Sequence, residues 1–285
     1  MLGTLGDLVE DIVVRLGGPI NIASDTDALV VRRRGGSAAN VAASAARAGF
    51  AARFIGQVGS DAHGGVLIDA LRADGVDVVC PRGGRTGTVV VLVDQQGERT
   101  MLSDRGSCGD LADPDPAWLD GLSALHVPLY SLIDGALAQT AATLIEWAHE
   151  RGILVSIDAS SAAVIIAHGV DRVVEMLAVL RPDVLLCNEL EAACLGDAVD
   201  PLRFAGRVTV VKHGSGASMV SEVGHVSVAV PTPHIDNVRD TTGAGDAFAA
   251  GFLTALIAGE SIIAATNAGH VIAGRAIVVA SAQAA

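Results

Sequence analysis

Basic residues are scarce in this sequence of 285 residues, and lysine occurs only once, at Lys212. The 19 Lys and Arg residues are outnumbered by 32 Asp and Glu residues, which gives a formal net charge of −13. A protein with this charge and without a basic stripe is poorly suited to bind nucleic acid or an anionic membrane surface. We expect neither as a partner, and an anionic ligand would have to be held by local groups.

Cysteine is also scarce, and the 4 cysteines lie at Cys80, Cys108, Cys187 and Cys194. None of them forms a Cys-x-x-Cys pair, and no histidine lies at the spacing of a zinc site. The sequence does not start with a basic segment followed by an apolar one, so no secretory leader is predicted. These observations favour free thiols in a reducing cytosol, and therefore a cytoplasmic protein.

Aromatic residues make up only 3% of the chain, whereas 51% of its residues are hydrophobic. The predicted core therefore consists of Ala, Val, Leu and Ile. The most apolar stretch, residues 247–274, is interrupted by Gly259 and Glu260, which favours two buried helices over a helix that spans a membrane. Neither a Walker A loop nor a Gly-x-Gly-x-x-Gly loop occurs, which disfavours a dehydrogenase.

Strand and helix patterns alternate through the second half of the chain. Such alternation predicts βαβ units, a parallel sheet and helices on both of its faces, which is a doubly wound α/β fold. Functional groups then belong beyond the carboxyl ends of the strands, and Tyr130, Asp158 and Asn188 each follow a predicted strand. The strands are predicted at residues 124–128, 153–157, 184–187 and 208–211, and the helices at residues 135–150, 169–179 and 189–195.

The most informative stretch is Asp240-Thr-Thr-Gly-Ala-Gly-Asp-Ala-Phe248, which precedes an apolar, Ala-rich run. A helix that starts here would direct its unpaired first-turn N–H groups and its positive dipole end toward a ligand, which makes an anion site. A carboxylate at the same place, Asp246, predicts a base that deprotonates a hydroxyl group while the anion site holds a phosphoryl group. The alternative is that Asp240 or Asp246 caps the helix and the glycines form its turn.

A second motif, Gly35-Gly36-Ser-Ala-Ala-Asn40, lies far upstream. In this order and spacing, the two motifs resemble the paired signatures of the ribokinase-like carbohydrate kinases, the PfkB family. The resemblance extends from Gly6 to about Asn267. It implies one ribokinase-like α/β domain over residues 1–285, with a doubly wound, mostly parallel sheet and a small β-sheet lid.

The resemblance places the lid in two segments, at about residues 12–34 and 85–104. A hairpin pattern supports the second segment, because Thr86–Val93 and Glu98–Leu102 flank the turn signal of residues 94–97. The arginine run at residues 32–34 indicates an exposed edge strand. A lid excludes water, which otherwise competes as an acceptor, and the family implies a homodimer that pairs through the lid.

The resemblance implies that the protein transfers the γ-phosphoryl group of ATP to a sugar hydroxyl, as in ribose, fructose or a related sugar. Asp246 would take the proton of that hydroxyl. Gly243, Ala244 and Gly245 would form the anion hole around the transferring group. ATP and Mg²⁺ are the implied cofactors, and K⁺ is a further candidate.

Five residues are candidates for binding the sugar. Asp11 fits the aspartate of a Gly-x-x-x-x-Asp pattern, which in the family bonds to sugar hydroxyls. Gly36 would let the sugar approach the backbone, and Asn40 would donate and accept hydrogen bonds. Tyr130 follows a predicted strand, and Arg105 would reach a carboxylate or a phosphate oxygen, unless it is a surface charge.

Another set of residues is predicted to bind the nucleotide and its metal ion. Asn188 and Glu191 match the family motif Asn-x-x-Glu, in which the glutamate holds Mg²⁺ through water; a plain helix cap is the alternative. The further nucleotide-binding candidates from the resemblance are Lys212, Gly214, Gly216, Thr242 and Asn267. Asp240 and Thr242 are the candidate ligands of K⁺.

Two other readings of the same residues stay open. Within enzymes, the chain could be an adenosine-type nucleoside kinase or a 2-keto-3-deoxygluconate-type kinase, and Arg105 favours an acidic sugar. Outside enzymes, it could be a sugar-binding protein without catalysis, although the intact Gly-Ala-Gly-Asp sequence at residues 243–246 argues against this.

Overall fold

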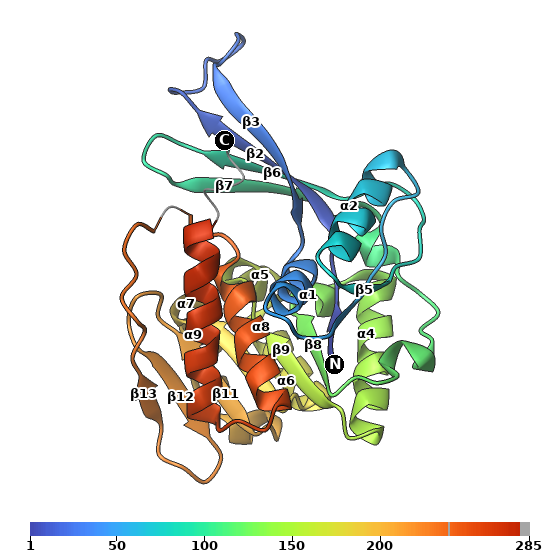
Figure 1. The fold of residues 1–285 in the computed structure, drawn as a ribbon, viewed down its shortest axis with the longest axis vertical. Helices are drawn as coiled ribbons and strands as arrows, with labels where there is room; N and C mark the ends of the chain where they lie inside the picture. The colour runs from blue at the N-terminus through green and yellow to red at the C-terminus, as the bar shows by residue number, and fades with distance from the viewer. Residues whose placement is uncertain (239, 280–285) are drawn as a thin grey trace.

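The computed structural model describes residues 1–238 and 240–279 of the chain. In this part of the chain, a nine-stranded sheet lies between two layers of helices, and a separate four-stranded sheet stands above it (Figure 1). The expected fold, a mostly parallel sheet with helices on both faces and a small β-sheet lid, is confirmed. No helix among the described residues is long and apolar enough to cross a membrane.

The large sheet has the order β13-β12-β11-β10-β9-β8-β1-β4-β5. From β11 to β5 the strands pair in parallel, whereas β12 and β13 extend the sheet as antiparallel strands, which the alternation pattern did not predict. The parallel strands are apolar runs because both of their faces are covered. The strands are β1 (Leu2–Leu5), β4 (Ala52–Ile55), β5 (Asp77–Val79), β8 (Ala124–Pro128), β9 (Leu154–Asp158), β10 (Val184–Asn188), β11 (Val208–Lys212), β12 (Ser218–Glu222) and β13 (Val228–Val230).

Two hydrophobic cores fill the spaces between the sheet and its helices. Helices α1, α2, α8 and α9 pack against one face, and α4, α5, α6 and α7 pack against the other (Figure 1). Residues Ala247 to Ala255 of α8 are buried all round because α1, α9 and the sheet surround this helix. The helices are α1 (Ser37–Arg47), α2 (Ala62–Ala73), α3 (Tyr130–Ile133), α4 (Gly135–Glu150), α5 (Ala162–His168), α6 (Val170–Leu180), α7 (Glu189–Leu195), α8 (Ala244–Ile257) and α9 (Ile262–Val279).

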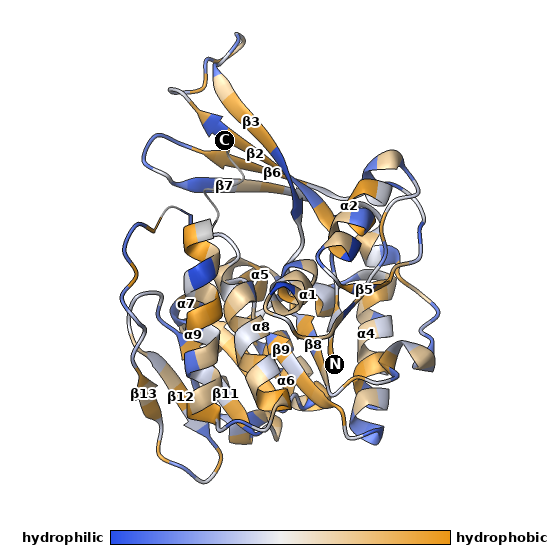
Figure 2. Cartoon of the chain, in the orientation of Figure 1, coloured by the Kyte–Doolittle hydropathy of each residue, from blue (hydrophilic) through white to orange (hydrophobic). Residues whose placement is uncertain are grey.

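The small sheet, which we call the lid, has the order β3-β2-β6-β7. Its strands are β2 (Val9–Leu16), β3 (Ala28–Gly35), β6 (Thr88–Val93) and β7 (Arg99–Asp104). The pairs β2–β3 and β6–β7 are antiparallel, so each half of the lid comes from one segment of the chain. Strand β3 is the expected edge strand, and it changes from hydrophobic to hydrophilic along its length as it reaches its arginines (Figure 2).

The chain leaves the large sheet for the lid at Gly6, whose φ of 155° lies in a region that favours glycine. The sequence predicted a turn and one strand here, whereas the structure has strands on both sides of Gly6. After the first half of the lid, β2 and β3, the chain returns to the large sheet as β4 on one side of β1. After the second half, β6 and β7, it enters β8 on the other side of β1. Strand order therefore reverses at β1, and a ligand crevice is expected beyond the carboxyl ends of β1 and β8.

Candidate active site

The first turn of α8 starts at the Gly-Ala-Gly-Asp sequence, as the prediction of an anion site requires. Gly243 occupies the N-cap position in the left-handed region, with φ of 75° and ψ of 4°, and no side chain caps the helix. The N–H of Ala244 donates to the Thr241 carbonyl at 3.1 Å, whereas no side chain caps the N–H groups of Gly245 and Asp246, where the helix dipole adds positive potential. The alternative in which Asp240 or Asp246 caps this helix is wrong, because no side chain accepts from its first N–H groups and Asp246 accepts from Ser37 and Asn40 instead.

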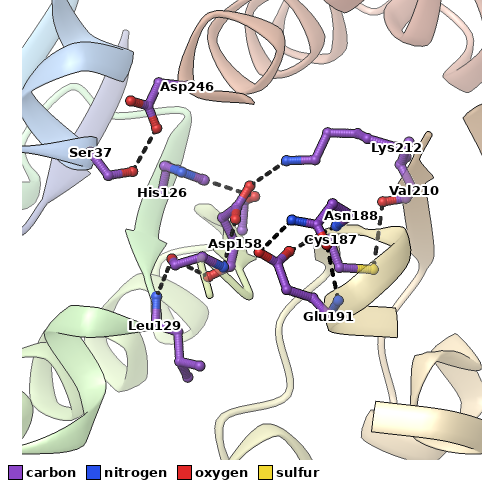
Figure 3. A network of polar contacts seen from close by, with 12 residues as sticks. Ser37, His126, Leu129, Asp158, Cys187, Asn188, Glu191, Val210, Lys212 and Asp246 are labelled. Carbon is purple, nitrogen blue, oxygen red and sulfur yellow. Dashed lines mark hydrogen bonds and ion pairs between the residues drawn. The ribbon is translucent and has the colours of Figure 1, made fainter. Parts of the chain in front are cut away.

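Asp246 lies in the first turn of α8 and faces α1, which starts at Ser37. Its Oδ1 accepts a hydrogen bond of 2.7 Å from the Ser37 hydroxyl (Figure 3). Its Oδ2 accepts one of 3.0 Å from the Asn40 amide. Burial raises the pKa of Asp246 to about 6, although both hydrogen bonds act to lower it. At neutral pH the carboxylate is ionised and close to its titration, which suits a general base.

A cavity of about 390 Å³ opens between the lid and the carboxyl ends of the strands. Its polar wall includes Asp11, Gly36, Tyr130 and Asp246, so four of the predicted residues lie together. Burial raises the pKa of Asp11 to about 6 against the nearby arginines of β3. Lid residues of β2, β6 and β7 form an apolar wall opposite, namely Val9, Val89, Val91 and Met101.

Arg105 also lines this cavity, and it is neither a free surface charge nor an unpaired anion ligand. Its Nε and Nη2 donate to the two oxygens of Asp7 at 2.8 and 2.6 Å, which makes a bidentate pair. Asp7 follows β1 and Arg105 follows β7, so the pair joins the lid to the large sheet. The remaining nitrogen of the guanidinium, Nη1, has no such partner on Asp7 and is available to a substrate oxygen.

A second cavity, of about 710 Å³, lies on the other side of the α8 N-terminus. Gly214 lines it together with Phe248 and His270, and its remaining wall is mostly apolar. The His270 ring lies 5.4 Å from the Phe248 ring, and its Nε2 lies 2.9 Å from the Ser218 hydroxyl. An aromatic and aliphatic cavity of this size suits a nucleobase with its ribose.

The two cavities share three residues, Asn188, Lys212 and Gly245. The Lys212 ammonium donates to Asp158 Oδ2 at 2.8 Å (Figure 3). Because Lys212 lines both cavities, this charge lies where they meet. Burial alone would lower the pKa of Lys212, but the carboxylate of Asp158 outweighs burial and the net shift is upward. Lys212 is therefore a fixed cation, and a Cβ placed on Gly245 would lie 3.6 Å from it.

Asn188 and Glu191 form a capping box at the start of α7. Asn188 Oδ1 accepts from two backbone N–H groups, and its own N–H groups donate to both oxygens of Glu191 at 2.8 and 2.7 Å. The alternative prediction for this motif, a helix cap, is therefore confirmed. Glu191 still lines the first cavity, and burial together with Asp158 raises its pKa. In the part of the chain that the structure describes, no three His, Cys, Asp or Glu side chains are grouped to hold a metal ion by themselves.

Four predicted residues are not on a cavity wall, namely Asn40, Gly216, Asp240 and Asn267. The Asn267 side chain is exposed and donates back to the Ile263 carbonyl, one turn earlier in α9, whereas His270 of the same helix faces the second cavity. Asn40 is turned toward Asp246 and Arg34 instead of the sugar cavity. Gly216 accepts a hydrogen bond from Thr232, a residue that does line the second cavity.

The carboxylate of Asp240 forms ion pairs with two arginines of the lid. Arg99 of β7 donates to its Oδ1 at 2.6 Å, and Arg33 of β3 approaches its Oδ2 at 3.5 Å. The same Oδ1 accepts hydrogen bonds from the backbone and the hydroxyl of Thr242. Two guanidinium groups beside one carboxylate make a poor environment for a further cation, so the Asp240 side chain does not fit the predicted K⁺ site. Thr242 lines the first cavity.

The sequence reasoning missed Ser37 and His270, and it placed Asp158 at a strand end without a role. Ser37 lies inside the motif that predicted Gly36 and Asn40, and helix periodicity could have placed it on the side of Asn40. His270 lies three residues after the predicted Asn267 in the same helix, and of the two it is His270 that lines the second cavity.

Comparison with known proteins agrees with this geometry. A family model described as "pfkB family carbohydrate kinase" matches residues 23–285. The chain belongs to the pfkB family. The ATP-dependent ribose-1-phosphate kinase of Halopiger xanaduensis is 36% identical over 228 residues, which cover 77% of this chain and 72% of that protein. A fructokinase of Klebsiella pneumoniae is 31% identical over 259 residues, which cover 84% of this chain and 82% of the relative.

Solved structures of pfkB-type proteins share the fold over the whole length. An adenosine kinase from Sinorhizobium meliloti superposes with a TM-score of 0.85 and 25% identity, covering 100% of this chain and 99% of the other. Ribokinase from Arabidopsis thaliana, complexed with ribose and ATP, has a TM-score of 0.81 and 22% identity, with coverage of 97% and 92%. The protein is a carbohydrate kinase of the pfkB family, as the two motifs predicted.

Proposed function

We propose that this pfkB carbohydrate kinase transfers the γ-phosphoryl group of ATP to a hydroxyl group of ribose, fructose or a related sugar. The observation that carries the proposal is the position of Asp246. Its carboxylate lies beside open N–H groups at the start of α8, next to the place where two cavities meet. One cavity has polar groups for a sugar, and the other has an apolar wall for a nucleobase.

The roles of the residues follow from their positions. Asp246 takes the proton of the acceptor hydroxyl as its oxygen attacks the γ-phosphorus. The backbone N–H groups of Gly245 and Asp246 bind the charge that develops on the transferred group, whereas the N–H of Ala244, which was predicted to take part, donates to the Thr241 carbonyl. Lys212 adds a fixed positive charge at the junction of the cavities. Asp11 and Arg105 orient the sugar from the lid side, while Asp246 approaches it from α8.

Mg²⁺ fits this site as an ion held mainly by phosphates and water. Glu191 is the protein group that supplies a carboxylate, and each of its oxygens accepts one hydrogen bond from Asn188, which leaves lone pairs for water. When bound, Mg²⁺ would neutralise part of the negative charge of the phosphates. For K⁺ we propose no role of the Asp240 side chain, because Arg33 and Arg99 already neutralise it.

The acceptor cavity also supports a second candidate, a nucleoside or a phosphorylated sugar. Its apolar lid wall, Val89, Val91 and Met101, would contact a base, and Arg105 offers a free N–H edge to an anionic substituent. The relative that acts on ribose 1-phosphate makes this compound a required member of any substrate panel. The carboxylate of a 2-keto-3-deoxygluconate-type acid would accept hydrogen bonds from the same edge of Arg105.

We further propose that the lid pairs with a second copy of the chain. Strands β3 and β7 form its two edges, and both expose large apolar side chains. Leu29, Val30, Met101 and Leu102 are 59%, 55%, 55% and 56% exposed. Light scattering of Leu29→Arg and Leu102→Arg variants would show a monomer where the parent is a dimer; a parent that is monomeric at micromolar concentration refutes the pairing.

The test of the proposed activity is ADP formation from ATP and Mg²⁺ with a panel of acceptors: ribose, ribose 1-phosphate, fructose, adenosine and 2-keto-3-deoxygluconate. One acceptor should raise turnover well above the background without acceptor. Asp246→Asn should then lose roughly two to four orders of magnitude in kcat while it keeps acceptor binding. Acceptors that raise the melting temperature without any turnover would instead support a binding protein, and full activity of Asp246→Asn would remove the base assignment.

A further inference from the structure

The carboxylate of Asp246 is held from one side by two residues of α1. Ser37 donates to Oδ1 at 2.7 Å and Asn40 donates to Oδ2 at 3.0 Å, and both donors are more than 200 positions away in the chain. Ser37 and Asn40 are three residues apart, so they lie on the same face of the helix. Figure 3 shows the Ser37 hydroxyl directed at the carboxylate across the gap between the helices.

The orientation of the Asn40 amide is fixed by a third residue. Arg34 Nη1 lies 3.2 Å from Asn40 Oδ1, and a guanidinium can only donate hydrogen bonds. The atom of the amide that faces Arg34 must therefore be the oxygen, and the amide nitrogen must face Asp246. Arg34 is itself held near Asp74, at 3.7 Å, and its side chain is only 11% exposed. The series Asp74, Arg34, Asn40, Asp246 thus determines which group meets the carboxylate.

The position of Ser37 is fixed by the backbone before it. Gly36 has φ of 98° and ψ of 122°, and α1 begins directly after it. A side chain on Gly36 would collide with the backbone of Asp7, so the chain passes close to the end of β1 before it enters the helix. Ser37 therefore lies in the first turn of α1, where its hydroxyl group donates its hydrogen bond to Asp246.

We propose that Ser37 and Asn40 are positioning residues that hold the carboxylate of Asp246 in the orientation for proton transfer, and that Arg34 sets the amide of Asn40. The proposal rests on the proposed role of Asp246 as the base. Each carboxylate oxygen has two lone pairs, and each receives one hydrogen bond from α1. One lone pair on each oxygen is left for the acceptor hydroxyl, and the carboxylate cannot rotate without breaking both bonds.

The hydrogen bonds from Ser37 and Asn40 also favour the ionised form of Asp246. Their effect on its pKa can therefore be measured from the pH dependence of activity. Burial raises the pKa of Asp246 to about 6, Ser37 and Asn40 lower it, Asp158 raises it and Lys212 lowers it. Two further ionisable groups interact with Asp246, Arg34 from β3 and Tyr130 from α3. The active form is the ionised one, so activity falls as pH falls through the pKa. Loss of a donor raises the pKa, and this fall should then occur at higher pH.

The first experiment is the pH dependence of kcat/KM between pH 5 and 9 for the full chain and Ser37→Ala, with the best acceptor of the panel. We call the fall of kcat/KM toward low pH the acid limb. In Ser37→Ala the midpoint of this limb should move up by about one pH unit. At pH values below the midpoint, kcat/KM should then be roughly tenfold lower than in the parent, and at higher pH the loss should be smaller. Ser37→Thr keeps the hydroxyl and should restore the parent profile. Ser44→Ala, on the same helix, is the control, because the Ser44 hydroxyl bonds to none of the described residues.

The second experiment tests the relay to Asn40. Arg34→Met should move the acid limb in the same direction, because the amide of Asn40 is then free to turn its oxygen toward Asp246. Arg47→Met is the matched control, since Arg47 binds the same Asp74 at 2.8 Å but does not contact Asn40. A smaller folded fraction lowers kcat/KM by the same factor at every pH, so it does not move the midpoint of the acid limb. Melting temperatures of the variants record any loss of stability.

The outcomes separate the two proposals. If Asp246→Asn is inactive and the limb of Ser37→Ala stays where it is in the parent, Asp246 remains the base and the positioning role of Ser37 is wrong. If Asp246→Asn keeps its activity, the base assignment fails first. A limb that moves equally in Ser37→Ala, Ser37→Thr and Ser44→Ala would show a general effect of changes in α1, which also overturns the inference.

Discussion

Replacement of Lys212 by methionine should destabilise the protein and abolish its activity for two separate reasons. The ammonium lies 2.8 Å from Asp158 Oδ2, and the two side chains are only 15% and 13% exposed. Removal of one partner of a buried pair leaves the other charge without compensation, which costs about 3–5 kcal/mol. Asp158 keeps one hydrogen bond, from the N–H of Ser160 at 2.8 Å, so we expect the lower end, about 3 kcal/mol.

Urea unfolding and thermal melting measure this cost. A loss of about 3 kcal/mol corresponds to a decrease in melting temperature of roughly 5–10 °C in a chain of this size. The double variant Lys212→Met, Asp158→Asn should recover most of the stability, to within about 1 kcal/mol of the parent, because no unpaired charge is left. Arg207→Met is a control for loss of a surface cation, since its contact with Glu222 is 3.9 Å and largely exposed.

The activity of the double variant then separates the two roles of Lys212. If the cation binds the phosphoryl group, the stable double variant stays inactive, because the positive charge at the junction of the cavities is lost. Recovery of activity together with stability would show that Lys212 serves the fold alone. A single Lys212→Met variant as stable as the parent would refute the argument that this pair is buried and mutually dependent.

Two further predictions concern the flanks of the site. Gly36→Ala should cost more than about 2 kcal/mol of unfolding free energy in urea titrations, because its φ of 98° strains other residues and its Cβ meets the Asp7 backbone; an unchanged midpoint would contradict the close approach. Asn267→Ala should leave the KM for ATP unchanged, whereas His270→Ala should raise it about tenfold through loss of its ring contact in the second cavity. The reverse ranking would place the nucleobase against Asn267 instead of His270.

The local elements of this fold follow from local sequence signals. Glycine stops, apolar runs and the turn at residues 94–97 placed β8 to β11, the helices α4, α6 and α7 and the β6–β7 hairpin close to their observed bounds, whereas the short helices α3 and α5 were not predicted. These signals act over a few residues, so they are visible without the structure. Strands β12 and β13 were missed as part of the sheet, because antiparallel pairing at a sheet edge is set by contacts with β11 and not by a pattern of their own.

The site was predictable where a motif carries its own geometry. The glycines around Asp246 and the box of Asn188 and Glu191 are local structures, and their roles depend on neighbours a few residues away. The partners of Arg105 and Lys212 were not predictable, because Asp7 and Asp158 are 98 and 54 positions away and meet them only through the topology. Whether an arginine in a loop is paired or free depends on such distant contacts.

The shared wall of the two cavities has a consequence for inhibition. Asn188, Lys212 and Gly245 border both spaces, so the two cavities adjoin at these three residues. A compound that joins a sugar to the terminal phosphate of a nucleotide would place each half in its own cavity without a long linker. Such joined ligands gain a factor on the order of 10² to 10⁴ over either half, provided that the linker spans the two sites. The same geometry means that an analogue of only one half leaves the other cavity free for the second substrate.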